Sequence, residues 1–271
     1  MPALTPEQAG LTLYGGNRRV SGLRREEVAM LAGVSVDYYT RLERGNLGGV
    51  SESVLESLAR ALKLDEAERA HLFDLARAAT NTSAVRRRTP AQRVRPPIQR
   101  IVDSMVGTAA WVRNGRMDFL AANTLGAALF APVLDSPARP ANTARFAFLD
   151  PRAREFYGDW ARTSEDIVAM LRAEAGRNPY DKPLTDLVGE LSTRSDEFRT
   201  RWAAHDVRFH RTGTKRIHHP VVGTMHLAYE AMEITADEGL TLLAYTAEPG
   251  TPDADALALL ASWAAPETAD R

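Results

Sequence analysis

The stretch LRREEVAMLAGVSVDYYTRLERG, residues 23–45, decides the fold of the N-terminal part of the chain. Its first half has the apolar spacing of a short helix that opens at Arg24, with three residues on one side: Val28, Leu31 and Ala32. Leu23 precedes this helix and is placed to pack on Val28. Gly33 suits the left-handed residue that ends a helix, and Ser35 suits the N-cap of the next one.

A second helix is predicted after this cap. Tyr39 and Leu42 are spaced to face inward, and Gly45 ends the helix. Two helices of about nine residues joined by about three have the size of a helix-turn-helix. The outward side chains of the second helix are long or polar enough to touch a base edge or a phosphate: Val36, Asp37, Tyr38, Arg41 and Arg44. The pattern therefore predicts a DNA-binding motif.

The net charge of −1 over 271 residues conceals an asymmetry. Residues 1–100 hold 16 lysines and arginines against 11 aspartates and glutamates, a net charge of +5, and the remainder carries −6. A basic front and an acidic back indicate that only the front approaches a polyanion. The alternative is a chance imbalance of solvated surface charge.

Length and composition narrow the class of protein. The chain exceeds one average domain, so two domains are expected. It has no cysteine, which excludes disulfides, thiolate zinc sites and cysteine nucleophiles. No run approaches 18 uninterrupted apolar residues, and the N-terminus MPALTPEQAG lacks a signal-peptide pattern. We expect a soluble, cytoplasmic protein without membrane contact.

Two more helices complete an expected all-α N-terminal domain, residues 1–79. Ser51 is placed to cap a helix that runs to Leu64, and Asp65 to cap another with three residues inward: Leu72, Leu75 and Ala76. Residues 80–97 are expected to form an Arg/Pro-rich linker, because three prolines forbid a continuous helix: Pro90, Pro96 and Pro97. The linker arginines either lie along a DNA backbone or only keep the linker soluble.

Residues 98–271 have the pattern of an α+β domain with an antiparallel sheet. Strands Thr108–Val112 and Met117–Asn123 flank an Asn-Gly pair, the strongest short hairpin signal. Around them we expect helices over 98–105 and 125–130, then a loop over 132–143. Helices are expected over 150–175 and, as a pair divided by a cap at Ser195, over 184–204. The remaining expected elements are strands 207–211, 215–222, 224–234 and 240–246, a turn at 212–214, and a helix over 254–264.

The run GLRREEVAMLAGVSVDYYTRLERG resembles the lambda-repressor-like (Xre-type) helix-turn-helix domains of the MmyB-like regulators. Further segments similar to that family lie in the back of the chain: Asp150–Arg154, Leu187–Leu191, Gly213–Arg216, His219–Gly223 and Tyr245–Gly250. The resemblance implies a transcription regulator whose C-terminal domain has a PAS-like fold and binds a small, lipophilic, fatty-acid-like ligand. Domains of this family usually begin with a helix ahead of the segment that here starts at Ala3, and that helix is not found in this sequence. Either the start codon was assigned late or the first helix is absent.

The resemblance also implies a docking mode, in which the second helix lies in the major groove with its N-terminal residues at base edges. The base readers are then Val36, Asp37, Tyr38 and Arg41. The phosphate contacts are then Arg24, Arg25 and Arg44. An arginine–guanine contact is worth about 1–3 kcal/mol of discrimination, so Arg41 is expected to dominate specificity. Asp37 either accepts from a cytosine amine or only stabilises the first helical turn.

A PAS-like sheet presents one face to helices, and a ligand cavity there is lined by apolar and aromatic groups with few polar anchors. The candidate ligand-binding residues are Trp111, Phe119, Asn123, Phe130, Trp202, His205, Tyr229 and Tyr245. Asn123 is the most suggestive polar residue, because it ends a strand that reads as buried. For each aromatic residue, ordinary core packing is the alternative.

Metal and catalytic sites are not expected. Four histidines invite a metal hypothesis, namely His205, His210, His218 and His219, but adjacent residues on a strand point to opposite faces. A His-Glu-x-x-His spacing is absent from the sequence, as are a Gly-x-Ser-x-Gly elbow and a phosphate-cradling glycine loop. We therefore expect a protein that is not an enzyme and needs no cofactor other than the ligand.

The function expected from the sequence is sequence-specific transcription regulation by a homodimer. Its partners are double-stranded DNA, bound at an imperfect palindrome, and a small molecule in the C-terminal domain. One rival keeps DNA binding but makes the back domain a module that only dimerises or docks a protein partner. A second rival is an enzyme tethered to DNA.

Overall fold

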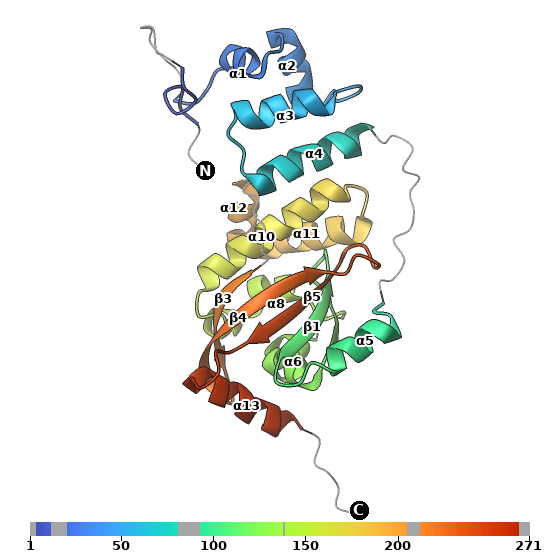
Figure 1. Cartoon of the computed structure of the whole chain (residues 1–271), viewed down its shortest axis with the longest axis vertical. Coiled ribbons are helices and arrows are strands. Elements are labelled where there is room, and N and C mark those ends of the chain that lie inside the picture. The colour runs from blue at the N-terminus through green and yellow to red at the C-terminus, as the bar shows by residue number, and fades with distance from the viewer. Residues whose placement is uncertain (1–3, 12–20, 81–92, 138, 205–211, 266–271) are drawn as a thin grey trace, which may run out of the picture. The chain divides into compact units, whose positions relative to one another are not determined.

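A computed structural model describes residues 4–11, 21–80, 93–137, 139–204 and 212–265. The chain divides into two compact units, the first helical and the second built around a sheet (Figure 1). Among the described residues, no helix is both long enough and apolar enough to cross a membrane.

The first unit contains the four helices that the sequence predicts. They are α1 (Arg25–Ala32), α2 (Val36–Glu43), α3 (Glu52–Ala61) and α4 (Glu66–Thr80). The Ser35 hydroxyl accepts from the backbone N–H of Tyr38 at 3.1 Å, which confirms the predicted cap of α2. Gly33 lies in the left-handed region with φ 68°, as the end of α1 requires. The turn between α1 and α2 is therefore fixed by two residues whose roles are local.

A small apolar core holds α1, α2 and α3 together. Its buried residues are Val28, Ala32, Leu42, Leu58 and Ala61, and Leu23, Tyr38, Tyr39 and Leu72 pack against them. The predicted contact of Leu23 with this core is thus confirmed. The inward placement of Leu75 on α4 is wrong, because its side chain is 42% exposed. Ala76, its neighbour, is buried as predicted.

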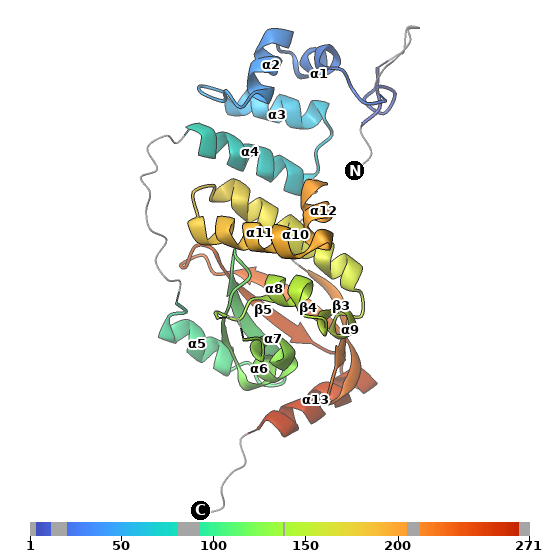
Figure 2. The ribbon, with the colours of Figure 1, turned by 180° about the vertical axis from the view of Figure 1, so that it is seen from behind.

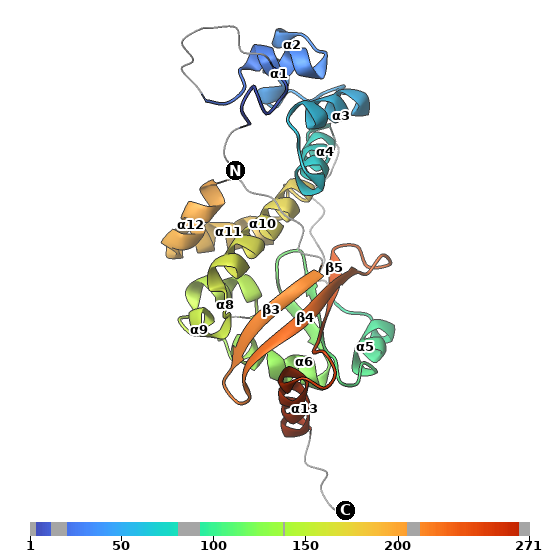
Figure 3. The same ribbon diagram turned by 60° about the vertical axis from the view of Figure 1, so that its left-hand side comes forward.

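The second unit is built on a five-stranded sheet in which every neighbouring pair is antiparallel. Its strands are β1 (Ala109–Asn114), β2 (Phe119–Ala122), β3 (Thr212–His219), β4 (Gly223–Glu233) and β5 (Leu240–Thr246). Their order across the sheet is β2-β1-β5-β4-β3. Figure 3 shows strands β3, β4 and β5 of this sheet. The predicted fold class, a helical head followed by an α+β domain with an antiparallel sheet, is confirmed.

Helices cover both faces of this sheet. On one face lie short helices α6 (Thr124–Leu129), α7 (Ala131–Leu134), α8 (Thr143–Leu149) and α9 (Ala153–Phe156), seen from behind in Figure 2. Gly126 permits the close approach of α6 to β1, since a Cβ there would stand 2.2 Å from the Ala110 carbonyl oxygen. On the other face α5 (Pro96–Asp103) packs Val102 on Val112 and Leu242.

The remaining helices are α10 (Trp160–Arg177), α11 (Lys182–Arg194), α12 (Asp196–Ala203) and α13 (Pro252–Ala264). Ser195 caps α12 as predicted, its hydroxyl accepting from the backbone N–H of Phe198 at 3.2 Å. Helix α5 begins two residues earlier than predicted, because proline is well tolerated in the first turn of a helix. The predicted loop over 132–143 instead contains most of α7, and α8 follows it.

Two predictions for the back of the chain are wrong. The single helix expected over 150–175 is broken between Phe156 and Trp160, where Tyr157 pairs with Ile217 of β3. The turn expected at Thr212–Thr214 is the start of β3. Gly213 lies there because a Cβ would stand 3.2 Å from the Tyr229 ring on the neighbouring strand. The strand expected over 207–211 lies outside the described residues.

The break between α9 and α10 covers part of the outer edge of β3. The backbone N–H of Gly158 donates to the Arg216 carbonyl oxygen at 3.0 Å. The Arg216 guanidinium in turn donates to the Gly158 carbonyl oxygen. The Tyr157–Gly158 segment therefore occupies main-chain groups of an edge strand that would otherwise have no partner there.

Candidate DNA-binding surface and ligand pocket

The exposed face of α2 carries most of the predicted DNA-contacting residues. Val36 is 45% exposed, and Asp37, Arg41 and Arg44 are exposed as well. Tyr38 is half-buried, because one side of its ring packs against the core of the first unit. Five of the predicted residues thus lie on α2 or at its end. Four of them are exposed and the fifth, Tyr38, is half-buried.

Arg41 and Tyr38 form a unit of their own. The Arg41 guanidinium carbon lies 4.9 Å from the centroid of the Tyr38 ring, within the range of a cation–π contact. Within the part of the chain that the structure describes, neither Arg41 nor Arg44 forms an ion pair. Their positive charges are therefore available to an external anion.

Arg25 and Arg24 differ from the α2 arginines because each already has an acidic partner. The Arg25 Nε donates to the Glu43 carboxylate at 2.5 Å, which joins the start of α1 to the end of α2. Arg24 lies 3.7 Å from Glu26 and forms the cap of α1. Burial, the Glu43 charge and a hydrogen bond to Glu43 raise the pKa of Tyr39 to about 12. Tyr39 is half-buried and packs against the core of the first unit, the side on which it was predicted to face.

Five of the predicted ligand-binding residues meet on one face of the sheet. We call them the ring cluster: Trp111, Phe119, Phe130, Tyr229 and Tyr245. The rings of Trp111 and Phe119 stack with centroids 4.6 Å apart and planes 6° apart. Phe130 lies 5.1 Å from Trp111 and 5.4 Å from Tyr245. Tyr229 adjoins Tyr245 at 5.8 Å.

The other three predicted residues are placed differently. The side-chain oxygen of Asn123 accepts from the N–H groups of Ala110 and Gly126, and its amide donates to the carbonyl oxygens of Met105 and Thr108. Its polar atoms therefore cap α6 and tie it to β1. Trp202 stacks on Phe198 of α12, outside the ring cluster. His205 lies outside the described residues.

Polar groups that the sequence did not single out adjoin the ring cluster. Tyr157 is buried, and burial raises the pKa values of both Tyr157 and Tyr245. Lys215 is half-buried, with its Nζ 3.7 Å from Asp166 and 5.7 Å from the centroid of the Tyr229 ring. Burial lowers the Lys215 pKa although Asp166 opposes the change. Strand alternation was the only available signal for Lys215, since Ile217 and His219 share its face.

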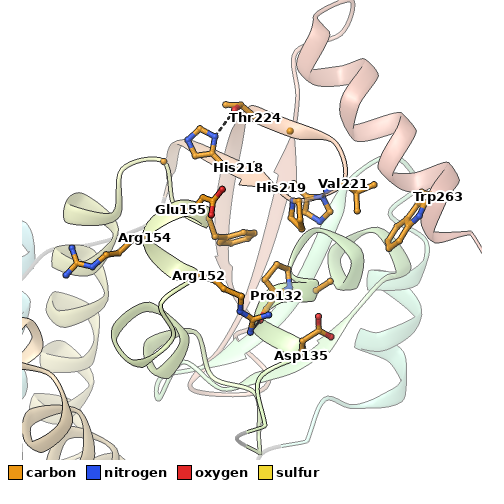
Figure 4. A pocket seen from close by; sticks show the side chains of 15 residues that line it. Pro132, Asp135, Arg152, Arg154, Glu155, His218, His219, Val221, Thr224 and Trp263 are labelled. Carbon is orange, nitrogen blue, oxygen red and sulfur yellow. Dashed lines mark hydrogen bonds between the residues drawn. The ribbon is translucent and has the colours of Figure 1, made fainter.

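A hollow of about 820 Å³ opens beside the ring cluster, as shown in Figure 4. Its rim runs from His218 on β3 to Trp263 on α13, and Phe156 of α9 forms part of its wall. The Phe156 ring centroid lies 6.0 Å from that of Phe130. Phe156 therefore contacts both the hollow and the ring cluster.

The two adjacent histidines at this rim have different partners. His219 is buried, with Nε2 3.1 Å from the Ala128 carbonyl oxygen and Nδ1 accepting from the N–H of Val221. Burial lowers its pKa. His218 is less buried and lies 2.6 Å from the Thr224 hydroxyl. Across the described ranges, no three His, Cys, Asp or Glu residues are grouped to hold a metal ion.

A helix-turn-helix with unpaired arginines on its second helix, joined to a separate α+β domain, defines the class of helix-turn-helix transcription regulators. Comparison with protein families specifies the assignment. Residues 17–72 match a helix-turn-helix domain, and residues 94–260 match the MmyB-like transcription regulator ligand binding domain. Because the second match spans more than half of the chain, the protein belongs to the MmyB-like transcription regulators. No curated protein matched the chain in a similarity search.

The family match confirms the resemblance read from the sequence. The chain is a transcription regulator with a DNA-binding helix-turn-helix and a ligand-binding domain.

Proposed function

We propose that the protein is a cytoplasmic, sequence-specific regulator that binds DNA as a homodimer and responds to a small lipophilic molecule, without enzymatic activity. One observation carries the proposal. The exposed face of α2 presents arginines that have no acidic partner among the described residues, in a chain whose other domain matches a ligand-binding family. The proposal assigns DNA recognition to the helix-turn-helix domain and regulation to the C-terminal domain.

The α2 surface supports binding in the major groove. Arg41 is the proposed base reader, because its contact with the Tyr38 ring orders the guanidinium before DNA arrives. Arg44 is proposed to bind a phosphate. Arg25 is proposed to do so while it remains paired with Glu43. Val36 and Asp37 lie in the first turn of α2, where base edges are reached in this docking mode.

The ring cluster supports an apolar ligand. Five aromatic side chains are gathered on one sheet face, and Phe156, which lines the hollow, contacts one of them, Phe130. Ligand pockets are mostly apolar with a few placed polar groups, which matches this composition. The rival, a domain that only dimerises or docks a partner protein, needs no such gathering.

The test uses the full chain in two assays. A selection from random duplexes is expected to enrich one palindromic sequence, and native mass spectrometry of the purified protein is expected to show excess mass in the lipophilic range. Operator affinity is then measured before and after extraction of that molecule with a hydrophobic resin. Failure to enrich any duplex contradicts DNA recognition. An operator affinity that is unchanged by extraction supports the docking rival.

A further inference from the structure

Trp111 of β1 holds a buried hydrogen-bond donor that has no acceptor. The side chain is 3% exposed, and its Nε1 has no hydrogen-bond partner among the described residues. An unsatisfied buried donor costs about 1–3 kcal/mol. Trp160 offers the contrast, since its Nε1 donates to the Ala147 carbonyl oxygen at 2.8 Å. The Trp111 indole N–H is therefore a buried donor that has no acceptor within the part of the chain that the structure describes.

The neighbours of Trp111 are aromatic on two sides. Phe119 stacks on it at 4.6 Å and Phe130 lies 5.1 Å away. The next polar groups in the ring cluster are the hydroxyls of Tyr245 and, beside it, Tyr157, and within the described part of the chain neither has a hydrogen-bond partner. An indole N–H only donates, whereas a phenol hydroxyl can donate and accept. Among the described residues, however, neither hydroxyl nor any other acceptor is hydrogen-bonded to the Trp111 Nε1.

We propose that the Trp111 indole N–H is the polar anchor of the ligand site in the C-terminal domain, where it binds an acceptor oxygen on an otherwise apolar molecule. The inference rests on the proposed function, that this domain binds a lipophilic ligand. It adds the chemistry of the polar end: a carbonyl, ether or carboxylate oxygen. A pure hydrocarbon leaves the indole unsatisfied, and a ligand whose polar end only donates meets another donor.

Access to the anchor follows from the burial of the rings. Phe119 is only half-buried and comes from β2, an edge strand of four residues, whereas the other four rings are buried. Displacing Phe119 from its stack on Trp111 therefore disturbs less of the core than displacing any other member. The ligand is proposed to take the place of the Phe119 ring.

The test compares two probes of similar shape, 4-phenyl-2-butanone and butylbenzene, which differ in a carbonyl oxygen. The chain has four tryptophans, so the indole N–H region of an NMR spectrum contains four signals. Trp160→Phe, Trp202→Phe and Trp263→Phe assign three of them, and the Trp111 signal follows by elimination. We expect the ketone to shift the Trp111 N–H proton downfield, butylbenzene to leave it near its apo position, and the Trp160 signal to stay fixed with both.

Affinity gives a second readout. A net hydrogen bond of up to about 1.4 kcal/mol makes the wild type bind the ketone up to about tenfold more tightly than butylbenzene. Trp111→Phe is expected to abolish this preference, whereas the control Trp160→Phe keeps it. Because the preference is a ratio within one protein, it is independent of the volume lost in each variant.

The outcomes separate the two levels of the proposal. Binding of both probes without a carbonyl preference, or a preference retained in Trp111→Phe, overturns the anchor and leaves the proposed ligand domain standing. If neither probe binds the wild type at millimolar concentration, the lipophilic site itself is wrong, and the anchor with it. Should Trp111→Phe fail to fold, the wild-type N–H shifts decide alone.

Discussion

At the scale of single residues, the arginines of the first unit divide into two kinds. Arg41 lies on the Tyr38 ring and Arg44 is exposed, and neither has an acidic partner in the described residues. Arg25 is instead paired with Glu43. A paired arginine must share its donors with its partner, so Arg41 and Arg44 are better placed to bind DNA.

Replacing Arg41 is predicted to reduce specificity. Arg41→Ala should cost about 1–3 kcal/mol at the operator, roughly tenfold to a hundredfold in affinity, with little change on random DNA. The matched control is Arg44→Ala, for which both affinities should fall alike and the salt dependence should weaken by about one unit of slope. Titrations at several salt concentrations measure both. Unchanged operator affinity of Arg41→Ala contradicts its assignment as base reader.

Tyr39 is predicted to make stability depend on alkaline pH. Its pKa is raised from 10.0 to about 12, so the folded state holds the hydroxyl proton more tightly than the unfolded chain does. This contribution is complete below pH 10 and is lost as the pH rises to about 12. Urea unfolding between these values should show a steeper loss for the wild type than for Tyr39→Phe. Parallel curves for the two proteins would rule out this role.

At the scale of elements, short caps decide where the helices of the first unit begin. The Ser35 hydroxyl holds the first turn of α2, and with it the orientation of the DNA-facing side chains. Ser35→Ala is predicted to destabilise the unit by about 1 kcal/mol and to lower operator affinity as well. Ser57→Ala is the control, since its hydroxyl contacts only the exposed Arg60 side chain. Thermal unfolding with equal midpoints for the two variants would refute the importance of this cap.

The edge strand β2 is predicted to control entry to the ring cluster. Phe119→Ala removes a half-buried ring, so it should destabilise the domain by less than the about 3–5 kcal/mol of a core Phe→Ala change. The cavity it leaves should bind butylbenzene more tightly than the wild type does, because dry apolar cavities accept benzene-like molecules. Trp202→Ala, outside the cluster, should leave probe affinity unchanged. Calorimetry measures the affinity of each variant for butylbenzene. Weaker binding by Phe119→Ala than by the wild type would argue against entry of the ligand at β2.

The elements that the sequence predicted well are those whose signals are local. Gly33 and Ser35 act within one turn, and the alternation of β4 needs only the chain itself. The break before α10 was missed because Phe156 and Trp160 remain in helical phase across it, while the pairing of Tyr157 with Ile217 is a tertiary contact. The turn expected at Thr212–Thr214 was wrong for the same reason. Gly213 lies against the ring of Tyr229, which is distant in the sequence, and from the sequence alone such a glycine resembles one that forms a turn.

For the candidate sites too, local signals could be predicted from the sequence and tertiary contacts could not. The four aromatic candidates that lie on strands, Trp111, Phe119, Tyr229 and Tyr245, are on one face of the sheet, as strand periodicity allows, and their role in ligand binding stays a prediction. Asn123 was read as a ligand contact, yet its hydrogen bonds to Ala110 and Gly126 show that it caps a helix. An N-cap pattern at the start of α6 was the signal that could have shown this. The sequence does not reveal that the Trp111 indole N–H lacks an acceptor, because this depends on the positions of all the side chains that surround it in the folded protein.

At the scale of the whole molecule, the charge of the chain is unevenly distributed, and its positive excess lies in and next to the linker. The net charge of residues 1–100 is +5 and that of the remainder is −6. Residues 1–79 hold 10 lysines and arginines against 11 aspartates and glutamates, whereas residues 80–97 hold five arginines and no acidic residue. Non-specific contact with phosphates is therefore expected to involve the linker arginines, and the acidic C-terminal part is expected to stay away from the DNA backbone.

Homodimeric binding is predicted to show itself in the operator. Half-sites bound by two heads must lie about one helical turn, or a multiple of it, apart. Inserting about 5 base pairs between them should reduce affinity to that of one half-site, and inserting about 10 should restore it if the linker spans the distance. Gel-shift titrations of the three operators test this. Equal affinity for all three would indicate that each chain binds alone.

The crossing of β3 by Tyr157 and Gly158 also bears on solubility. An outer strand with free amides and carbonyls is a template onto which extended chains can add, and such addition is how fibrils grow. Here the peptide groups around Arg216 and Ile217 are already bonded to the Tyr157–Gly158 segment. A substitution that loosens this segment is therefore expected to make the purified protein aggregate, seen as turbidity, before any loss of DNA binding is measured.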